Sequence, residues 1–227
     1  MTSDLKKCFV EFLGTFFLCF TILCCILLPV NPAIVPIAIG LVLAVLVYAG
    51  GPISGGHYNP AVSLAIFLIG KMGAKKTLLY CLFQIFGAVY AALMALTLSS
   101  AIESITASAF AKAPLIVGEI IFTTLLIYTV IFTAVSKRIQ GNPYFGFAIG
   151  GSVLIGVSAI GSISLAALNP AVAISVGIMK IAGWDIVLIT IIANLVASAI
   201  ACGLFKLLNI DDIQKVEVVG IDEFIRK

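Results

Sequence analysis

Long apolar runs without charge alternate with short charged clusters along the chain. No Asp, Glu, Lys or Arg occurs between Glu11 and Lys71, or between Arg138 and Lys180. A helix needs roughly 20 apolar residues to cross a bilayer, so each of these runs holds more than one membrane element. The whole pattern predicts six transmembrane helices, at residues 9–29, 33–51, 77–99, 114–136, 144–162 and 185–206.

Both uncharged runs are longer than the spans that they contain, and each surplus is about 20 residues long. One surplus contains Asn59 and the other contains Asn169. Each is too apolar for a loop in water, and its helical part is too short to cross the bilayer. A re-entrant half-helix, which enters and leaves the membrane on the same side, fits both segments.

A repeated tripeptide marks where the half-helices should begin. It occurs as Asn59, Pro60 and Ala61, and again 110 positions later as Asn169, Pro170 and Ala171. Asn is favoured as a helix N-cap and Pro at the first helical position, so each motif predicts a helix start. The loop residues before the motifs are Gly55, Gly56, His57 and Tyr58 in the first copy and Ala167 and Leu168 in the second. Non-helical backbone at membrane depth must be buried or line a water-filled cavity.

The two halves of the chain resemble each other beyond this tripeptide. Glu11 and Glu119 occur early in the first span of each half, and Ile39-Gly40 has a counterpart in Ile149-Gly150. Three spans per half is an odd number, so the second copy must enter the membrane inverted, which places a functional site where the halves meet. We therefore expect an all-α membrane protein with an inverted repeat. Its parts are a first half at 1–105, a second half at 106–208 and a cytoplasmic tail at 209–227.

Composition supports a protein of the lipid bilayer. The chain is 62% hydrophobic and 10% charged, with a mean hydropathy of +1.25, which excludes an ordinary soluble domain. Residues 12–30 are too long an apolar run for a signal-peptide core, so we expect a retained first span. By the positive-inside rule the lysines and arginines of the predicted loops place both termini in the cytoplasm. No basic, aromatic-interleaved stretch suggests nucleic acid.

Few residues suggest reactive chemistry. The six cysteines lie in or beside apolar segments without metal-ligand spacing, which is typical of small buried side chains. No nucleophile–base constellation occurs, so we do not expect an enzyme, a cofactor or a metal. Two opposed half-helices would instead bring two partial positive charges and two Asn amides to the centre of one pore. Such a constriction disfavours cations and suits a neutral molecule that forms hydrogen bonds.

At these residues the sequence resembles the aquaporin or major intrinsic protein family. SGGHYNPAVSLA and LNPAVAIS are similar to the two signature loops of the family, and EFLGTFFL to the start of its first span. The resemblance implies six spans with two half-helices, a homotetramer with a pore in each protomer, no cofactor, and passive movement of water or small neutral solutes. It gives Glu11 and Glu119 a structural role, holding the half-helix loops by hydrogen bonds.

The resemblance also implies an outer selectivity filter of four residues. By position relative to the motifs these are Ile39, Val157, Ala166 and Val172. Water-selective members have aromatic, His and Arg residues there, whereas all four are aliphatic in this chain. Some vacuolar plant members with a similar Ala and Val at the last two positions conduct ammonia, urea or hydrogen peroxide besides water. Glycerol channels usually place Asp after the Arg, and this chain has Ala173 there, which argues mildly against a dedicated glycerol channel.

Alternatives remain open from the sequence. A secondary transporter also has inverted repeats and buried acids, in which case Glu11 and Glu119 would couple ions. A membrane protein with a closed pore and a structural or regulatory role is a third hypothesis. His57 is interpreted as a loop-packing residue that responds to pH, with a direct solute ligand as the alternative. The last span lacks the Gly-Pro that is usual in the family.

Overall fold

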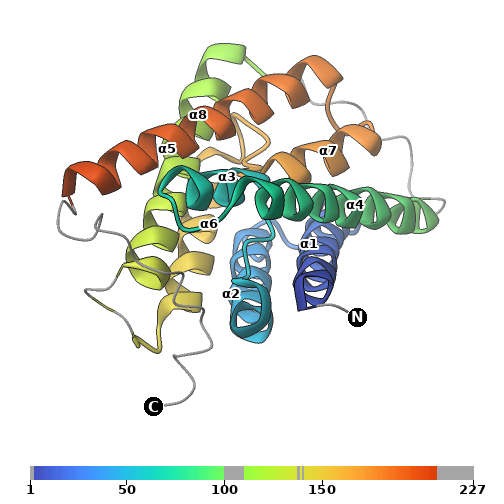
Figure 1. Ribbon diagram of the computed structural model, residues 1–227. Coiled ribbons are helices and arrows are strands. Elements are labelled where there is room, and N and C mark those ends of the chain that lie inside the picture. The colour runs from blue at the N-terminus through green and yellow to red at the C-terminus, as the bar shows by residue number, and fades with distance from the viewer. Residues whose placement is uncertain (1–2, 100–109, 137–138, 140, 209–227) are drawn as a thin grey trace.

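The computed structural model describes residues 3–99, 110–136, 139 and 141–208. Within these residues all regular secondary structure is helical. Figure 1 shows a bundle in which two short helices, α3 and α7, lie among longer ones. The helices are α1 (Ser3–Leu27), α2 (Val35–Ser54), α3 (Pro60–Leu68), α4 (Ala74–Ser99), α5 (Lys112–Val130), the π-helix η1 (Ile131–Val135), α6 (Phe145–Ile160), α7 (Pro170–Ile178) and α8 (Trp184–Leu208). The boundary expected at 105/106 and the expected tail at 209–227 lie outside the described residues.

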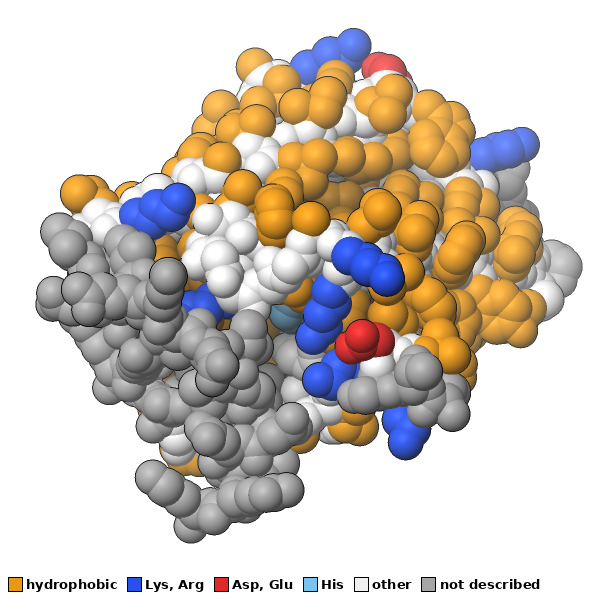
Figure 2. All heavy atoms as spheres, viewed as in Figure 1, with side chains coloured by type: hydrophobic (Ala, Val, Ile, Leu, Met, Phe, Trp, Pro, Cys, Tyr) orange, Lys and Arg blue, Asp and Glu red, His pale blue; other side chains and the backbone are white. Residues whose placement is uncertain are grey.

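Five of the helices are long and apolar enough to cross a membrane. They are α1, α2, α4, α8 and α5 extended by η1. Their lipid-facing sides carry large exposed hydrophobic side chains, which form the orange surface in Figure 2. Each long helix overlaps one predicted span, so the structure confirms these five spans.

The sixth predicted span, at 144–162, is a shorter apolar helix. It comprises the 16 residues of α6. Pro143 precedes it, and at its far end Ser164 N bonds to Ile160 O, which begins the loop toward the second motif. A helix of this length rises about 24 Å, less than the roughly 30 Å hydrocarbon core of a typical bilayer. The segments before and after α6 must therefore span the rest of the membrane thickness.

Helices α2 and α6 approach each other closely because each has a glycine at their crossing. A Cβ atom at Gly150 would overlap the carbonyl oxygen of Gly40, and one at Gly40 would lie 2.7 Å from the oxygen of Gly150. Small residues at helix crossings are the usual means of tight packing in membranes. The sequence match between Ile39-Gly40 and Ile149-Gly150 thus corresponds to a contact between the two halves.

The half-helices are held by the long helices of both halves. Ser198 Oγ on α8 donates to Ala61 O at 2.8 Å, and Cys202 Sγ donates to Ala65 O at 3.3 Å. Both bonds join α8 of the second half to α3 of the first. Cys202 is therefore a buried thiol with a backbone partner, and all six cysteines are free.

Candidate pore at the paired Asn-Pro-Ala motifs

Asn59 and Asn169 cap the two half-helices, as their sequence context predicts. Asn59 is extended, with φ −154°, and its Oδ1 accepts from Ala61 N at 2.8 Å. Asn169 has φ −161°, and its Oδ1 accepts from Ala171 N at 2.9 Å. Because the oxygen of each amide is used in capping, the Nδ2 group of each is directed away from its own helix.

These Nδ2 groups connect the two motifs. Asn59 Nδ2 donates to Leu168 O at 2.8 Å, and Asn169 Nδ2 donates to Tyr58 O at 2.9 Å. Each bond therefore crosses from one loop to the other. An amide nitrogen carries two hydrogens, so each Asn retains one more donor. Both residues line the same cavity.

Glu11 holds the first loop through four hydrogen bonds. Its carboxylate is fully buried and accepts from Ser54 Oγ at 2.6 Å, from the backbone N–H of His57 at 3.1 Å and of Tyr58 at 2.7 Å, and from Gln84 Nε2 at 2.8 Å. A buried carboxylate without partners would be strongly unfavourable. Four donors around one carboxylate fix the loop that leads to Asn59.

Glu119 holds the second loop in the same way. It accepts from Ser164 Oγ at 2.9 Å, from the backbone N–H of Ala167 and of Leu168 at 3.0 Å each, and from Asn194 Nδ2 at 3.0 Å. Each of these donors has a counterpart among the four donors to Glu11. The structure thus places both acids where the sequence analysis expected them, beside the backbone of the motif loops.

Two of these donors were missed in the sequence. Gln84 and Asn194 are buried polar residues on α4 and α8, and they supply the bonds that tie the long helices to the acids. Their spacing of 110 equals that of the two Asn-Pro-Ala motifs. A search for polar residues at that spacing inside apolar spans would have found them.

Left-handed backbone conformations recur at matched positions of the two loops. The φ angles are +63° at Gly56 and +48° at Tyr58 in the first loop. They are +43° at Ala166 and +50° at Leu168 in the second. Three of the four positions therefore hold a side chain in a conformation that favours glycine. Such strain persists only where the surroundings over-determine it, and the carboxylate bonds supply that constraint.

The ring of His57 packs within the first loop. Its Nδ1 lies 3.0 Å from Ser63 Oγ, which also accepts from Gln84 Nε2 at 3.0 Å. The ring meets Tyr80 edge-on, with 5.3 Å between ring centroids. His57 also lines the cavity and is visible from outside, as the pale-blue atoms set back in a hollow in Figure 2. The structure therefore supports the loop-packing interpretation and also places the ring at the pore wall.

One cavity of about 790 Å³ brings most of the predicted site residues together. Both motif asparagines line it. So do the four expected filter residues, Ile39, Val157, Ala166 and Val172, and the loop residues Gly56, His57, Ala167 and Leu168. None of the four filter side chains carries a hydrogen-bond donor, so this section of the wall is aliphatic.

The other predicted site residues support the wall from behind. They are Pro60, Ala61, Pro170 and Ala171, which are buried in the half-helices, together with Gly55, Tyr58, Glu11 and Glu119. Tyr58 fills the space left by two glycines, because a Cβ at Gly14 or at Gly50 would overlap its ring or hydroxyl. Its hydroxyl donates to Leu46 O at 2.9 Å, which anchors the loop to α2.

Comparison with known proteins decides the family. A family model described as Major intrinsic protein matches residues 1–205. The chain belongs to this family. Major intrinsic proteins are channels and not enzymes, which agrees with a site built from amides, carbonyls and aliphatic side chains.

Curated relatives and a solved structure agree with this family. Aquaporin-8 of Mus musculus is 40% identical over 159 residues, which cover 66% of this chain and 58% of that protein. Aquaporin TIP1-2 of Musa acuminata is 32% identical over 173 residues, which cover 73% and 67%. The X-ray structure of the aquaglyceroporin from Plasmodium falciparum matches with a TM-score of 0.74 at 22% identity, over 89% of this chain and 95% of that one. This last likeness is one of fold.

Proposed function

We propose that this major intrinsic protein is a passive transmembrane channel for water and small uncharged solutes. The observation that carries the proposal is the pair of crosswise bonds from Asn59 Nδ2 and Asn169 Nδ2, which leaves one free amide donor on each side of a shared cavity. Two helix N-termini meet at the same place, and their partial positive charges oppose cations. A neutral molecule that accepts hydrogen bonds is the occupant that this site suits.

The aliphatic ring of Ile39, Val157, Ala166 and Val172 supports a broad range of neutral solutes. A filter with a charged donor selects by hydrogen bonding and electrostatic repulsion. A ring without such a donor selects by size and by the loss of solute hydration. We therefore include ammonia, urea, hydrogen peroxide and glycerol with water as candidate solutes. Of these, glycerol is favoured least, because Ala173 stands where glycerol channels usually have Asp.

The proposed orientation places both termini in the cytoplasm. Lys7 at the start of α1 and Lys76 at the start of α4 are close enough for their charges to interact. Lys112 at the start of α5 pairs with Asp185 at the start of α8, and Phe110 just before it lines the cavity with Leu28 and Val30, which follow the end of α1. Lys112 and Asp185 therefore lie on the side opposite Lys7 and Lys76. Positive residues concentrate on the cytoplasmic side of membrane proteins. We further propose the homotetramer that is usual in the family, which native mass spectrometry in detergent would test by its mass.

A secondary transporter is the alternative from another class. In the structure both buried acids are surrounded by donors from the loops and from α4 or α8, which is the arrangement of a brace. The repeat would serve a transporter equally well. A closed pore with a structural or regulatory role is the remaining alternative.

Stopped-flow measurements on purified protein in liposomes separate these hypotheses. The panel is water, urea, ammonia, hydrogen peroxide and glycerol, each with and without a proton or sodium gradient. We expect flux of water and at least one further solute that is proportional to concentration and indifferent to the ion gradients. Saturable, gradient-dependent flux would support the transporter, and no flux from folded protein would support the closed pore.

A further inference from the structure

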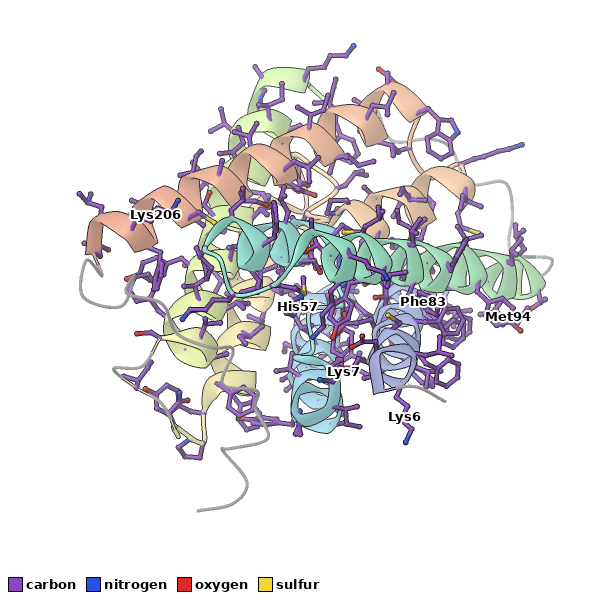
Figure 3. All side chains as sticks on the ribbon, in the orientation of Figure 1. Lys6, Lys7, His57, Phe83, Met94 and Lys206 are labelled. Atoms are coloured by element: carbon purple, nitrogen blue, oxygen red, sulfur yellow. The ribbon has the colours of Figure 1, made fainter. Side chains whose placement is uncertain are left out.

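Two pairs of lysines lie at the starts of α1 and α4. They are Lys6 with Lys7 and Lys75 with Lys76, which we call the basic rim. Lys6 and Lys75 are exposed, and Lys7 and Lys76 are half-buried. Figure 3 shows Lys7 and His57 on the same side of the bundle.

A chain of contacts connects the basic rim to the cavity wall. Lys76 Nζ lies 5.3 Å from the centroid of the Tyr80 ring, and that ring meets His57 with 5.3 Å between centroids. The charges of Lys7 and Lys76 are close enough to act on each other. Lys76 is therefore connected to the cavity wall through Tyr80 and His57.

The acids of the described part of the chain only partly offset the charge of this rim, because Asp4 and Glu11 act on Lys76 without forming an ion pair with it. Asp4 is the one exposed acid beside it, while Glu11 is buried and bonded to the loop. No ion pair is formed between Lys6, Lys7, Lys75 or Lys76 and a carboxylate of the described residues. A cluster of like charges without partners is unfavourable, and an anionic partner would remove that repulsion.

The segment that follows α8 has the complementary charge. Residues 209–227 contain five of the ten acids of the chain, against three basic residues. Four of these acids form two pairs, Asp211 with Asp212 and Asp222 with Glu223. The two acidic pairs of this segment are therefore complementary in charge and number to the two lysine pairs of the rim.

Residues 209–227 follow α8 on the side of the bundle that carries the basic rim. Because Lys112 on α5 pairs with Asp185 on α8, α8 starts on the side opposite the basic rim and ends at Leu208 on the rim's own side. The fourteen residues from 209 to 222 span at most about 50 Å when extended. A compact protein of this size has a radius of gyration of about 17 Å, so the rim is within reach.

From these observations we propose that the basic rim is a docking surface for the acidic C-terminal segment of this chain. The interaction is a set of ion pairs between Lys6, Lys7, Lys75 and Lys76 and the two acidic pairs of residues 209–227. It places the segment on the side of the bundle where Lys7 and His57 lie. The proposal uses the proposed function only to call the cavity a pore, and its test measures docking rather than transport.

Carbodiimide cross-linking of the full chain in phosphatidylcholine nanodiscs tests this docking. The reagent joins an amine to a carboxylate in direct contact, and both faces of a nanodisc are accessible to it. We expect cross-linked peptides between the rim lysines and Asp211, Asp212, Asp222 or Glu223 at about 0.1 M salt. They should decrease several-fold at about 1 M salt, where the Debye length falls from about 10 Å to about 3 Å.

The chain provides its own control pair and a charge-swap test. Lys112 and Asp185, 3.4 Å apart on the other side, should cross-link at low salt in every variant that keeps both. The double change Lys75→Glu with Lys76→Glu should remove cross-links from that lysine pair. Adding Asp222→Lys with Glu223→Lys should restore cross-links, now between the glutamates of the rim and the lysines of the segment. If the first variant misfolds, the same charge swap is made with Lys6→Glu and Lys7→Glu.

Three outcomes would overturn the proposal. One is the absence of rim cross-links in phosphatidylcholine while Lys112 and Asp185 still react. Another is cross-linking of the segment to Lys180 or Lys112 as readily as to the rim. The third is protection of the rim lysines from acetylation only when phosphatidylserine is added, which would make anionic lipid the partner.

Discussion

At the scale of single residues, the proposed selectivity depends on Val172 in the first turn of α7. This side chain lines the cavity with Ile39, Val157 and Ala166 and offers no hydrogen-bond donor. Val172→Arg would add a planar cation with several donors. We expect the ratio of urea to water permeability to decrease at least several-fold, because the guanidinium narrows the opening while water still exchanges hydrogen bonds with it. Stopped-flow light scattering on proteoliposomes measures both permeabilities.

Val172→Leu is the matched control for that prediction. It enlarges the side chain without adding a donor, so it separates steric narrowing from hydrogen bonding. A smaller decrease is expected than for Arg. If the parent already excludes urea, ammonia, hydrogen peroxide and glycerol, the aliphatic ring is narrower than its side chains suggest, and the permissive filter is contradicted.

Ala166 illustrates a second residue-scale effect, because its φ of +43° favours glycine. Ala166→Gly should stabilise the fold by on the order of 1 kcal/mol through relief of this strain, which raises Tm by roughly 2–4 °C. The neighbouring change Ala167→Gly, at a residue without positive φ, should lower Tm instead. Thermal unfolding of the purified protein in detergent measures both. Equal shifts in the two variants would show that the loop is not strained at Ala166.

At the scale of elements, the buried acids connect the motif loops to the long helices. Glu119→Gln replaces one carboxylate oxygen by an NH₂ group that faces the donors of Leu168 and Asn194. We expect a loss of stability on the order of 3 kcal/mol but nearly unchanged water permeability per folded molecule, and the same for Glu11→Gln. Thermal unfolding and stopped-flow flux, normalised to monodisperse protein, measure the two quantities.

The exposed Asp185 provides the reference substitution for these variants. Its ion pair with Lys112 is solvent-exposed, with side chains 62% and 61% accessible, so Asp185→Asn should change stability by less than about 1 kcal/mol. A stable, well-folded Gln variant without transport would contradict the bracing role of the acids. It would favour ion coupling through Glu11 or Glu119.

The crossing of α2 and α6 gives another element-scale prediction. Gly150→Ala places a methyl group against the carbonyl oxygen of Gly40 and should separate the helices, lowering Tm by several degrees. Gly151→Ala is the matched control, because a Cβ there meets no atom within 4 Å. That control should leave Tm unchanged or raise it slightly, since Ala is the better helix former. An unchanged Tm in both variants would mean that the helices do not cross at Gly40 and Gly150.

The elements that the sequence predicted best are those with a local physical cause. The half-helices begin at Asn59 and Asn169 because N-capping and the fixed φ of proline act within a few residues. The brace from Gln84 and Asn194 was missed because it depends on contacts between distant segments. The π-helix at Ile131–Val135 was also missed, since nothing in its apolar sequence distinguishes it from the helix before it.

At the scale of the whole molecule, the cavity unites residues from both halves of the chain. Ile39 and Asn59 come from the first half, and Val157, Asn169 and Val172 from the second. The apolar runs, together with the repeated Asn-Pro-Ala motif and the matched positions of Glu11 and Glu119, were enough to predict such an inverted bundle. They could not predict the size of the cavity, because that depends on how the side chains of both halves pack together.

The osmotic water permeability of the purified protein in liposomes tests the central claim most directly. With the amount of folded, reconstituted protein verified, we expect shrinkage many times faster than that of empty liposomes. Its temperature dependence should be weaker than that of the lipid alone, because water exchanges hydrogen bonds with Asn59, Asn169 and the loop carbonyls instead of losing them. Shrinkage no faster than that of empty liposomes would contradict the assignment of this cavity as an open water pore.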